Sequence, residues 1–162
     1  MFKILSVVLT VVFLFVNYSE AKKIPKFNLI TEEGYDFHRK DLKGKPTVLI
    51  FWGIHCHSCR EELPKINKVF QQYKKNVNFY AVAVDSSNLN QIKTKRKELK
   101  FDIPLLVGTR NIVYKFRIYG VPTIYILDKN TKIYKVLFGV QDNQKIKKYL
   151  NNLLSSEKEA KN

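Results

Sequence analysis

The chain has 162 residues, of which 29 are Lys or Arg and 14 are Asp or Glu, giving a formal net charge of +15. This length predicts one domain, and an apolar fraction of 45% excludes global disorder. Two cysteines and three histidines leave too little for a disulfide-dense scaffold, a four-cysteine zinc site or an all-histidine metal site. The basic residues are spread along the chain and only five are Arg, which disfavours nucleic-acid binding.

Residues 1–21 have the pattern of a signal peptide. Lys3 precedes an apolar run at 4–16, which is too short for a typical membrane span. Ser19 and Ala21 flank one larger residue, as at a signal-peptidase site, so we expect cleavage after Ala21. The remaining chain would be periplasmic or otherwise extracytoplasmic, where a cysteine pair can be oxidised. If cleavage does not occur, the same segment would anchor the protein to a membrane.

The rest of the chain alternates between strand and helix patterns. Residues 22–26 are expected to form a linker, and residues 155–162 a flexible tail. Between them, the predicted domain at 27–154 contains a hairpin at 27–37, strands at 47–52, 77–84, 103–107, 123–127 and 132–138, and helices at 56–74, 88–99, 111–116 and 144–154. The continuous apolar run at 47–52 predicts a central buried strand. This order indicates an α/β protein with a mixed central sheet flanked by helices.

Cys56 and Cys59 lie where this buried strand is predicted to give way to a helix. A spacer of two residues lets the two sulfur atoms come within bonding distance. The positive end of the helix then stabilises a thiolate on the first cysteine. A purely structural disulfide closing so short a loop would add little stability, so the pattern favours redox chemistry.

The segment 51–64 (FWGIHCHSCREELP) resembles the active-site segment of extracytoplasmic thioredoxin-fold thiol–disulfide oxidoreductases. The lead-in at 41–46 (DLKGKP), the pair Arg60 and Glu62, and the loop at 119–123 (YGVPT) also resemble that family. An extra strand and helix before the loop match its central insertion. The resemblance covers residues 27–154 and implies a thioredoxin fold.

The resemblance implies that Cys56 is the attacking thiolate and that Cys59 resolves the mixed disulfide. It also implies a cis peptide bond before Pro122, which would place the Val121 backbone beside the sulfur atoms, ready to pair with a substrate peptide. No cofactor and no metal are expected.

Glu62 is the candidate proton acceptor for Cys59. Many cytosolic thioredoxins carry a buried Asp at the position of Ile50, so here no carboxylate comes from the strand. Glu62 follows Cys59 by three residues, which puts both on one helix face. The alternative is that Glu62 merely complements the helix dipole.

His55, His57 and Trp52 are candidate pKa-tuning or substrate-binding residues. A protonated His57 would favour the Cys56 thiolate and make the pair more oxidising, whereas Glu62 would act in the opposite direction. The alternative is that both histidines form an exposed polar rim and that Trp52 belongs to the core.

The expected function is reduction of disulfides in extracytoplasmic proteins, including those of cytochrome c maturation. By resemblance, a membrane dithiol would supply electrons, and a monomer would suffice. The alternatives are a disulfide oxidant or isomerase, and a thioredoxin-fold copper or zinc chaperone. A peroxiredoxin-type peroxidase would need Pro and Thr where the chain has Leu49 and Gly53.

Overall fold

The computed structural model describes residues 22–159, so the predicted signal peptide lies outside the described residues. These residues form one seven-stranded sheet in the order β2-β1-β5-β4-β3-β6-β7. The strands are β1 (Asn28–Thr31), β2 (Asp36–His38), β3 (Thr47–Trp52), β4 (Asn78–Ala83), β5 (Leu105–Val107), β6 (Thr123–Leu127) and β7 (Ile133–Phe138). Strands β3, β4 and β5 are parallel, whereas β6 is antiparallel to both β3 and β7, which confirms the predicted mixed sheet.

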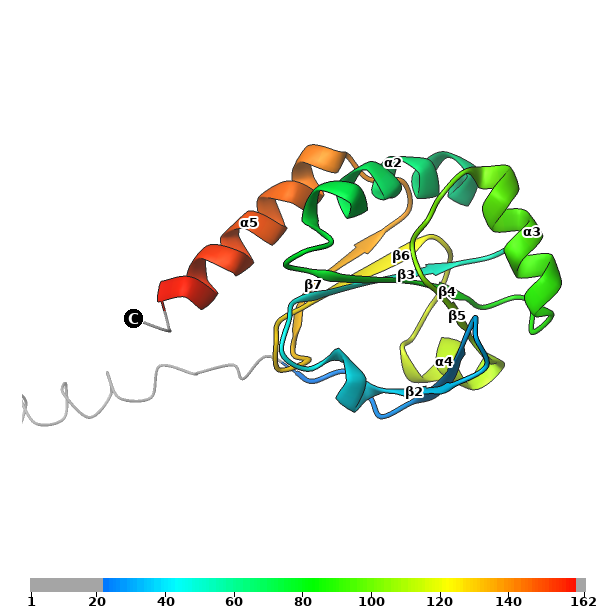
Figure 1. Cartoon of the computed structure of the whole chain (residues 1–162), viewed down its shortest axis with the longest axis horizontal. Coiled ribbons are helices and arrows are strands. Elements are labelled where there is room, and N and C mark those ends of the chain that lie inside the picture. Colours follow the sequence, from blue (N-terminus) through cyan, green and yellow to red (C-terminus); the bar gives the residue numbers. More distant parts are fainter. Residues whose placement is uncertain (1–21, 160–162) are drawn as a thin grey trace, which may run out of the picture.

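Helices cover both faces of the sheet. In Figure 1, α2 (His57–Tyr73), α3 (Leu89–Leu99) and α5 (Asn143–Glu159) lie above the sheet, and α4 (Arg110–Lys115) and the 3-10 helix η1 (Arg39–Leu42) lie below it. Each face therefore has its own apolar core. Within residues 22–159, no helix is both long enough and apolar enough to cross a lipid bilayer.

Strand β3 occupies the centre of the sheet, and all six of its residues are buried. Its side chains alternate between the two cores, so that Ile50 and Trp52 pack with α2, whereas Phe51 packs with the end of α4. This two-sided burial is why the strand has a continuous apolar sequence. The same rigid strand carries the chain to the first cysteine.

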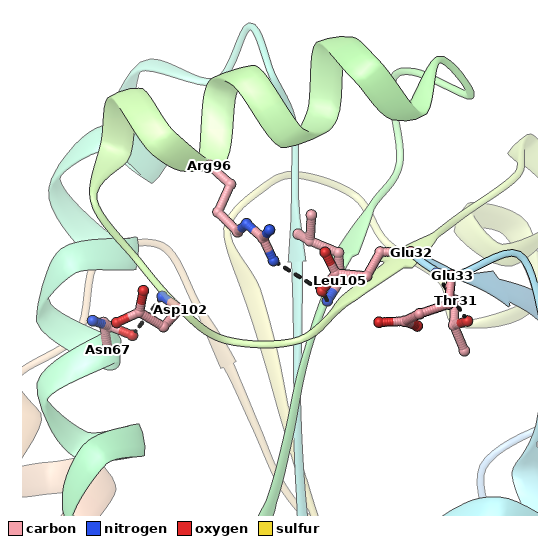
Figure 2. Close-up of polar contacts among 7 residues, drawn as sticks. All are labelled: Thr31, Glu32, Glu33, Asn67, Arg96, Asp102 and Leu105. Atoms are coloured by element: carbon pink, nitrogen blue, oxygen red, sulfur yellow. Dashed lines mark hydrogen bonds and ion pairs between the residues drawn. The ribbon is translucent and has the colours of Figure 1, made fainter.

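The predicted central insertion is formed by α3 and β5, which lie between β4 and α4. Arg96 of α3 forms an ion pair with Glu32 at 2.8 Å, and the same carboxylate oxygen accepts a hydrogen bond from the Leu105 N–H of β5 at 3.4 Å (Figure 2). Glu32 lies in the turn between β1 and β2. The pair therefore joins the N-terminal hairpin to both elements of the insertion.

Two predicted boundaries were wrong. Residues 22–26 are not a free linker, because Ile24 is fully buried and its N–H donates to the Thr131 carbonyl at 3.1 Å. Residues 155–159 are not part of a flexible tail either, since α5 continues to Glu159. A contact with the turn between β6 and β7 explains the extra turn of α5, because the Glu157 carboxylate accepts a hydrogen bond from the Lys129 N–H at 3.1 Å.

Helix α4 ends in a Schellman motif just before the loop that leads to β6. The Ile118 N–H donates to the Val113 carbonyl, and the Arg117 N–H donates to the Tyr114 carbonyl. Arg117 occupies the left-handed position of this motif, with φ 51°. Glycine usually stands at such a position, and a side chain there costs roughly 1 kcal/mol.

Candidate active site

The site begins where β3 ends and α2 starts. Cys56 and Cys59 form a disulfide, with an S–S distance of 2.16 Å and a Cα–Cα distance of 5.3 Å. Cys56 is the N-cap of α2, and its sulfur accepts the Cys59 N–H at 3.1 Å. Cys56 is half-buried, whereas Cys59 has no exposed surface. The first sulfur is therefore the accessible one, and the helix terminus is aimed at it.

The loop before β6 packs against this sulfur. The Val121–Pro122 peptide bond is cis, as predicted. The Val121 carbonyl oxygen lies 3.5 Å from Cys56 Sγ and accepts a hydrogen bond from Ser58 Oγ at 3.4 Å. Tertiary structure has thus brought residues 121–122 to the CxxC segment, and Ser58 joins the two.

Glu62 is fully buried on the inner side of the disulfide. Its Oε2 accepts a hydrogen bond from the Gln141 N–H at 2.9 Å, whereas Oε1 has no hydrogen-bond partner among the described residues. Burial raises the pKa of the Glu62 carboxyl above its ordinary value, an effect that the Gln141 N–H and the charge of Lys65 oppose. Glu62 follows Cys59 by one helical turn, so the two buried side chains share one face of α2.

The other three candidates lie in different surroundings. His55 and His57 are both exposed, one on each side of Cys56. Trp52 has no exposed surface and packs edge-on against Phe101, with the ring centroids 5.4 Å apart. Trp52 therefore does not contact a substrate directly, which corrects that part of the prediction, because its ring belongs to the core.

Asp85 has a position that the sequence did not reveal. It does not cap the following helix, because Asn88 caps α3. Asp85 instead accepts hydrogen bonds from the N–H groups of Ile54 at 2.9 Å and His55 at 3.1 Å, which hold the backbone leading to Cys56. A Cβ atom on Gly53 would lie 2.6 Å from the Asp85 carboxylate, so glycine is needed there. Because β3 and β4 are parallel, the residues that follow them meet at one edge of the sheet. This was the signal that could have placed Asp85 near residues 54–55.

Exposed apolar side chains border the loop. Tyr119 is 86% exposed and Phe138 is 61% exposed. The Gly139 N–H donates to the Pro122 carbonyl at 2.9 Å, which places the end of β7 beside the loop. Sequence reasoning assigned neither of these side chains to the site.

No group of three or more His, Cys, Asp or Glu side chains that could hold a metal ion occurs within residues 22–159. The groups gathered at the site are the two sulfur atoms, the Glu62 carboxyl and the backbone around them. The fold and the site together define a thioredoxin-fold thiol–disulfide oxidoreductase.

Comparisons with known proteins agree. The sequence profile of the AhpC/TSA family matches residues 21–136, and the chain belongs to that family. The chain is 33% identical over 132 residues to the thiol-disulfide oxidoreductase ResA of Bacillus cereus (strain ZK / E33L), covering 80% of this chain and 75% of the relative. It is 34% identical over 134 residues to ResA of Geobacillus thermodenitrificans (strain NG80-2), with the same coverage.

Solved structures show the same fold. A thiol:disulfide interchange protein from Chlorobium tepidum TLS superposes with a TM-score of 0.73 at 23% identity, covering 85% of this chain and 99% of the other. A putative thioredoxin from Neisseria meningitidis superposes with a TM-score of 0.71 at 26% identity, covering 84% and 92%. The predicted thioredoxin fold is thereby confirmed.

Proposed function

We propose that the protein is an exported dithiol reductant of protein disulfides. The Cys56 thiolate attacks one sulfur of a substrate disulfide, which forms a mixed disulfide and releases one substrate thiolate. Cys59 then loses its proton and attacks Cys56 Sγ, which forms the Cys56–Cys59 disulfide and releases the second substrate thiolate. The substrate gains two electrons, and a dithiol donor must reduce the protein again.

The observation that carries this proposal is the unequal exposure of the two sulfur atoms. Only Cys56 has surface that a substrate sulfur can approach, and Cys59 lies beneath it. The Cys59 N–H directed at Cys56 Sγ supports the thiolate that makes the first attack. This arrangement supports attack by Cys56 and resolution by Cys59.

Glu62 is the proposed proton acceptor for Cys59. Its Oε1 is buried without a hydrogen-bond partner among residues 22–159, and burial raises the pKa of its carboxyl, which makes the carboxylate a stronger proton acceptor. When ionised, it disfavours a nearby thiolate and makes the pair more reducing. His57 is exposed, so solvent screens its electrostatic influence, and we expect the buried carboxylate to dominate and to favour reduction over oxidation.

The proposed binding site for substrate backbone is the Val121–Pro122 loop. The Val121 carbonyl faces Cys56 Sγ at 3.5 Å, and within the described chain the Val121 N–H donates no hydrogen bond. An extended substrate segment that pairs there would bring its disulfide to Cys56. Exposed Phe138, next to the loop, would add apolar contact.

We further propose that residues 1–21 export the protein and that it works outside the cytoplasm as a monomer. The apolar run at 4–16 supports export, and mass spectrometry of the N-terminus would test cleavage after Ala21. A membrane dithiol is the proposed electron donor. Apocytochromes c, whose maturation the sequence resemblance implies, are the proposed substrates.

The reduction potential of the full chain tests the direction of electron flow. Thiol trapping in defined redox buffers would measure it. A value near that of thioredoxin, about −270 mV, is expected for a reductant. A value near about −120 mV would instead assign disulfide formation to this protein and would show that His57 outweighs Glu62.

A further inference from the structure

A groove lies beside the proposed substrate-binding loop, on α4 and on the connection from α4 to β6. The residues lining it include Arg110, Tyr114, Lys115, Arg117, Ile118 and Tyr119. The groove lies close to the disulfide along the chain, because its lining residue Tyr119 is two residues before Val121, whose carbonyl oxygen is 3.5 Å from Cys56 Sγ. A polypeptide at the disulfide would therefore have a flanking segment within reach of this groove.

The groove exposes aromatic rings. Tyr114 and Tyr119 are each 86% exposed, more than any other large apolar or aromatic side chain of the described residues. Such rings, with an apolar face and a polar hydroxyl, are enriched where proteins bind partners. Nothing within residues 22–159 covers either ring.

The groove is also uniformly cationic. Residues 109–123 contain Arg110, Lys115 and Arg117 but no Asp or Glu. In the described part of the chain, none of these three cations forms an ion pair with a carboxylate. Lys115 donates only to a backbone carbonyl, that of Lys26, at 3.4 Å. The groove thus presents positive charge with no internal counter-charge.

Arg117 adds an independent observation. It stands at the left-handed position of the Schellman motif, with φ 51°, where glycine would adopt the backbone without strain. Among the described residues, the Arg117 side chain forms no hydrogen bond and no ion pair that would offset this strain. A strained arginine without an internal partner, beside a redox site, points to an external anion.

We propose that this groove binds an acidic segment of the substrate polypeptide that flanks its disulfide, with carboxylates facing Arg110 and Arg117 and apolar atoms resting on Tyr114 and Tyr119. This inference rests on the proposed reductase function and adds to it a substrate class. The positive charge of the groove favours an acidic segment. Its position beside the Val121–Pro122 loop favours the substrate over an unrelated partner.

The test compares two synthetic peptides, each with one intramolecular disulfide, which differ only in an Asp/Glu-rich or an Asn/Gln-rich flank. The full chain, first reduced, is mixed with each peptide, and the single-turnover rate of peptide reduction is measured. We expect the acidic peptide to react roughly tenfold faster at low ionic strength, and the preference to shrink as salt is added.

Arg117→Gly is the central variant, since it removes one cation and also relieves the backbone strain. It should lower the acidic preference about threefold while leaving the thermal midpoint unchanged or raised. Lys148→Gln is the matched control, because it removes one exposed cation from α5 on the opposite face of the sheet (Figure 1) and should leave the preference almost unchanged. Equal losses in both variants would show only an effect of the net charge of +15 and would overturn the proposal.

Hydroxyethyl disulfide, which is small and neutral, distinguishes a failure of the proposed reductase function from a failure of the acidic-segment proposal. If the reduced protein fails to react with it, the reductase function itself is wrong. If all variants react with it equally and the two peptides react at one rate, only the acidic-segment proposal is overturned. Arg117-dependent binding to phosphatidylglycerol vesicles, without a peptide preference, would assign the groove to a lipid surface and would also overturn it.

Discussion

The two sides of the Cys56–Cys59 disulfide are built in opposite ways. On the inner side, Cys59 and Glu62 belong to the first turns of α2 and have no exposed surface. On the outer side, Cys56 faces the Val121 carbonyl, and the surface beyond it carries Tyr119 and unpaired cations. The inner side contains one carboxylate in apolar surroundings, whereas the outer side contains several charges in water.

This difference indicates a division of labour. A single buried charge is weakly screened, so it can control proton transfer at a neighbouring thiol. Exposed charges are strongly screened, so each contributes little to chemistry, but several together can attract and orient a partner. Changes on the inner side should therefore alter the reaction steps, and changes on the outer side should alter substrate preference.

The largest expected effect separates the two sulfur atoms. Cys56→Ser should abolish reduction of any disulfide, because the accessible nucleophile is lost. Cys59→Ser should instead accumulate a mixed disulfide between Cys56 and the substrate, visible by non-reducing electrophoresis and mass spectrometry. Insulin reduction by the Cys56→Ser variant at the rate of the unmodified protein would refute the enzyme assignment.

Glu62→Gln should slow resolution by Cys59 on the order of 10²-fold, since general-base assistance is lost. The initial attack by Cys56 should be nearly unchanged, so the mixed disulfide should build up transiently in rapid-quench experiments. Gln preserves the acceptor for the Gln141 N–H, which limits structural damage. Glu61→Gln, one position earlier and exposed, is the matched control. Unchanged rates at both steps would remove Glu62 from the mechanism.

The same substitution should change how stability depends on pH. Burial raises the pKa of Glu62 above its ordinary value of 4.5, so the folded state binds this proton more tightly than the unfolded state does. The free energy of unfolding should therefore fall as pH rises from 4.5 through the folded-state pKa. Urea unfolding of the oxidised protein across this range should show a smaller decline in Glu62→Gln. An equal decline in both proteins would mean that other groups cause it.

Tyr125→Phe tests the outer side without touching the disulfide. The buried Tyr125 hydroxyl donates to the Phe116 carbonyl at 2.6 Å and so supports the end of α4. Removing it should lower the free energy of unfolding by about 1 kcal/mol, because the carbonyl loses its partner. The rate with hydroxyethyl disulfide should be unchanged. A tenfold loss of that rate would show that the two sides are not separable.

The smallest expected effect concerns an ion pair that belongs to neither side of the disulfide. Glu32→Gln breaks the partly exposed ion pair with Arg96 that joins the hairpin to α3 (Figure 2). Chemical denaturation should show a loss of at most about 1 kcal/mol, because such pairs are partly screened. The reduction potential should not move. A shift in potential would indicate that the insertion is coupled to the active site.

Local sequence patterns determined much of the secondary structure and the position of the disulfide. The apolar run at 47–52, the helical spacing after Cys56 and the strand pair before and after Asp128 were sufficient to predict the central strand, α2 and the β6–β7 hairpin. The CxxC spacing and its place at the start of a helix identified the disulfide. These features depend on neighbours in sequence, through backbone periodicity and helix ends, so they can be found without a structure.

Tertiary structure decided what surrounds the disulfide. Glu62 is buried with the Gln141 N–H, 79 positions away, and Asp85 holds the backbone of residues 54–55 from the loop that follows β4. Trp52 is in the core because both faces of β3 are covered, and Ile24 packs against Thr131 rather than belonging to a linker. Each outcome depends on which distant segments the sheet brings together. Burial and hydrogen-bond partners across such distances follow from packing of the whole domain, which no local pattern encodes.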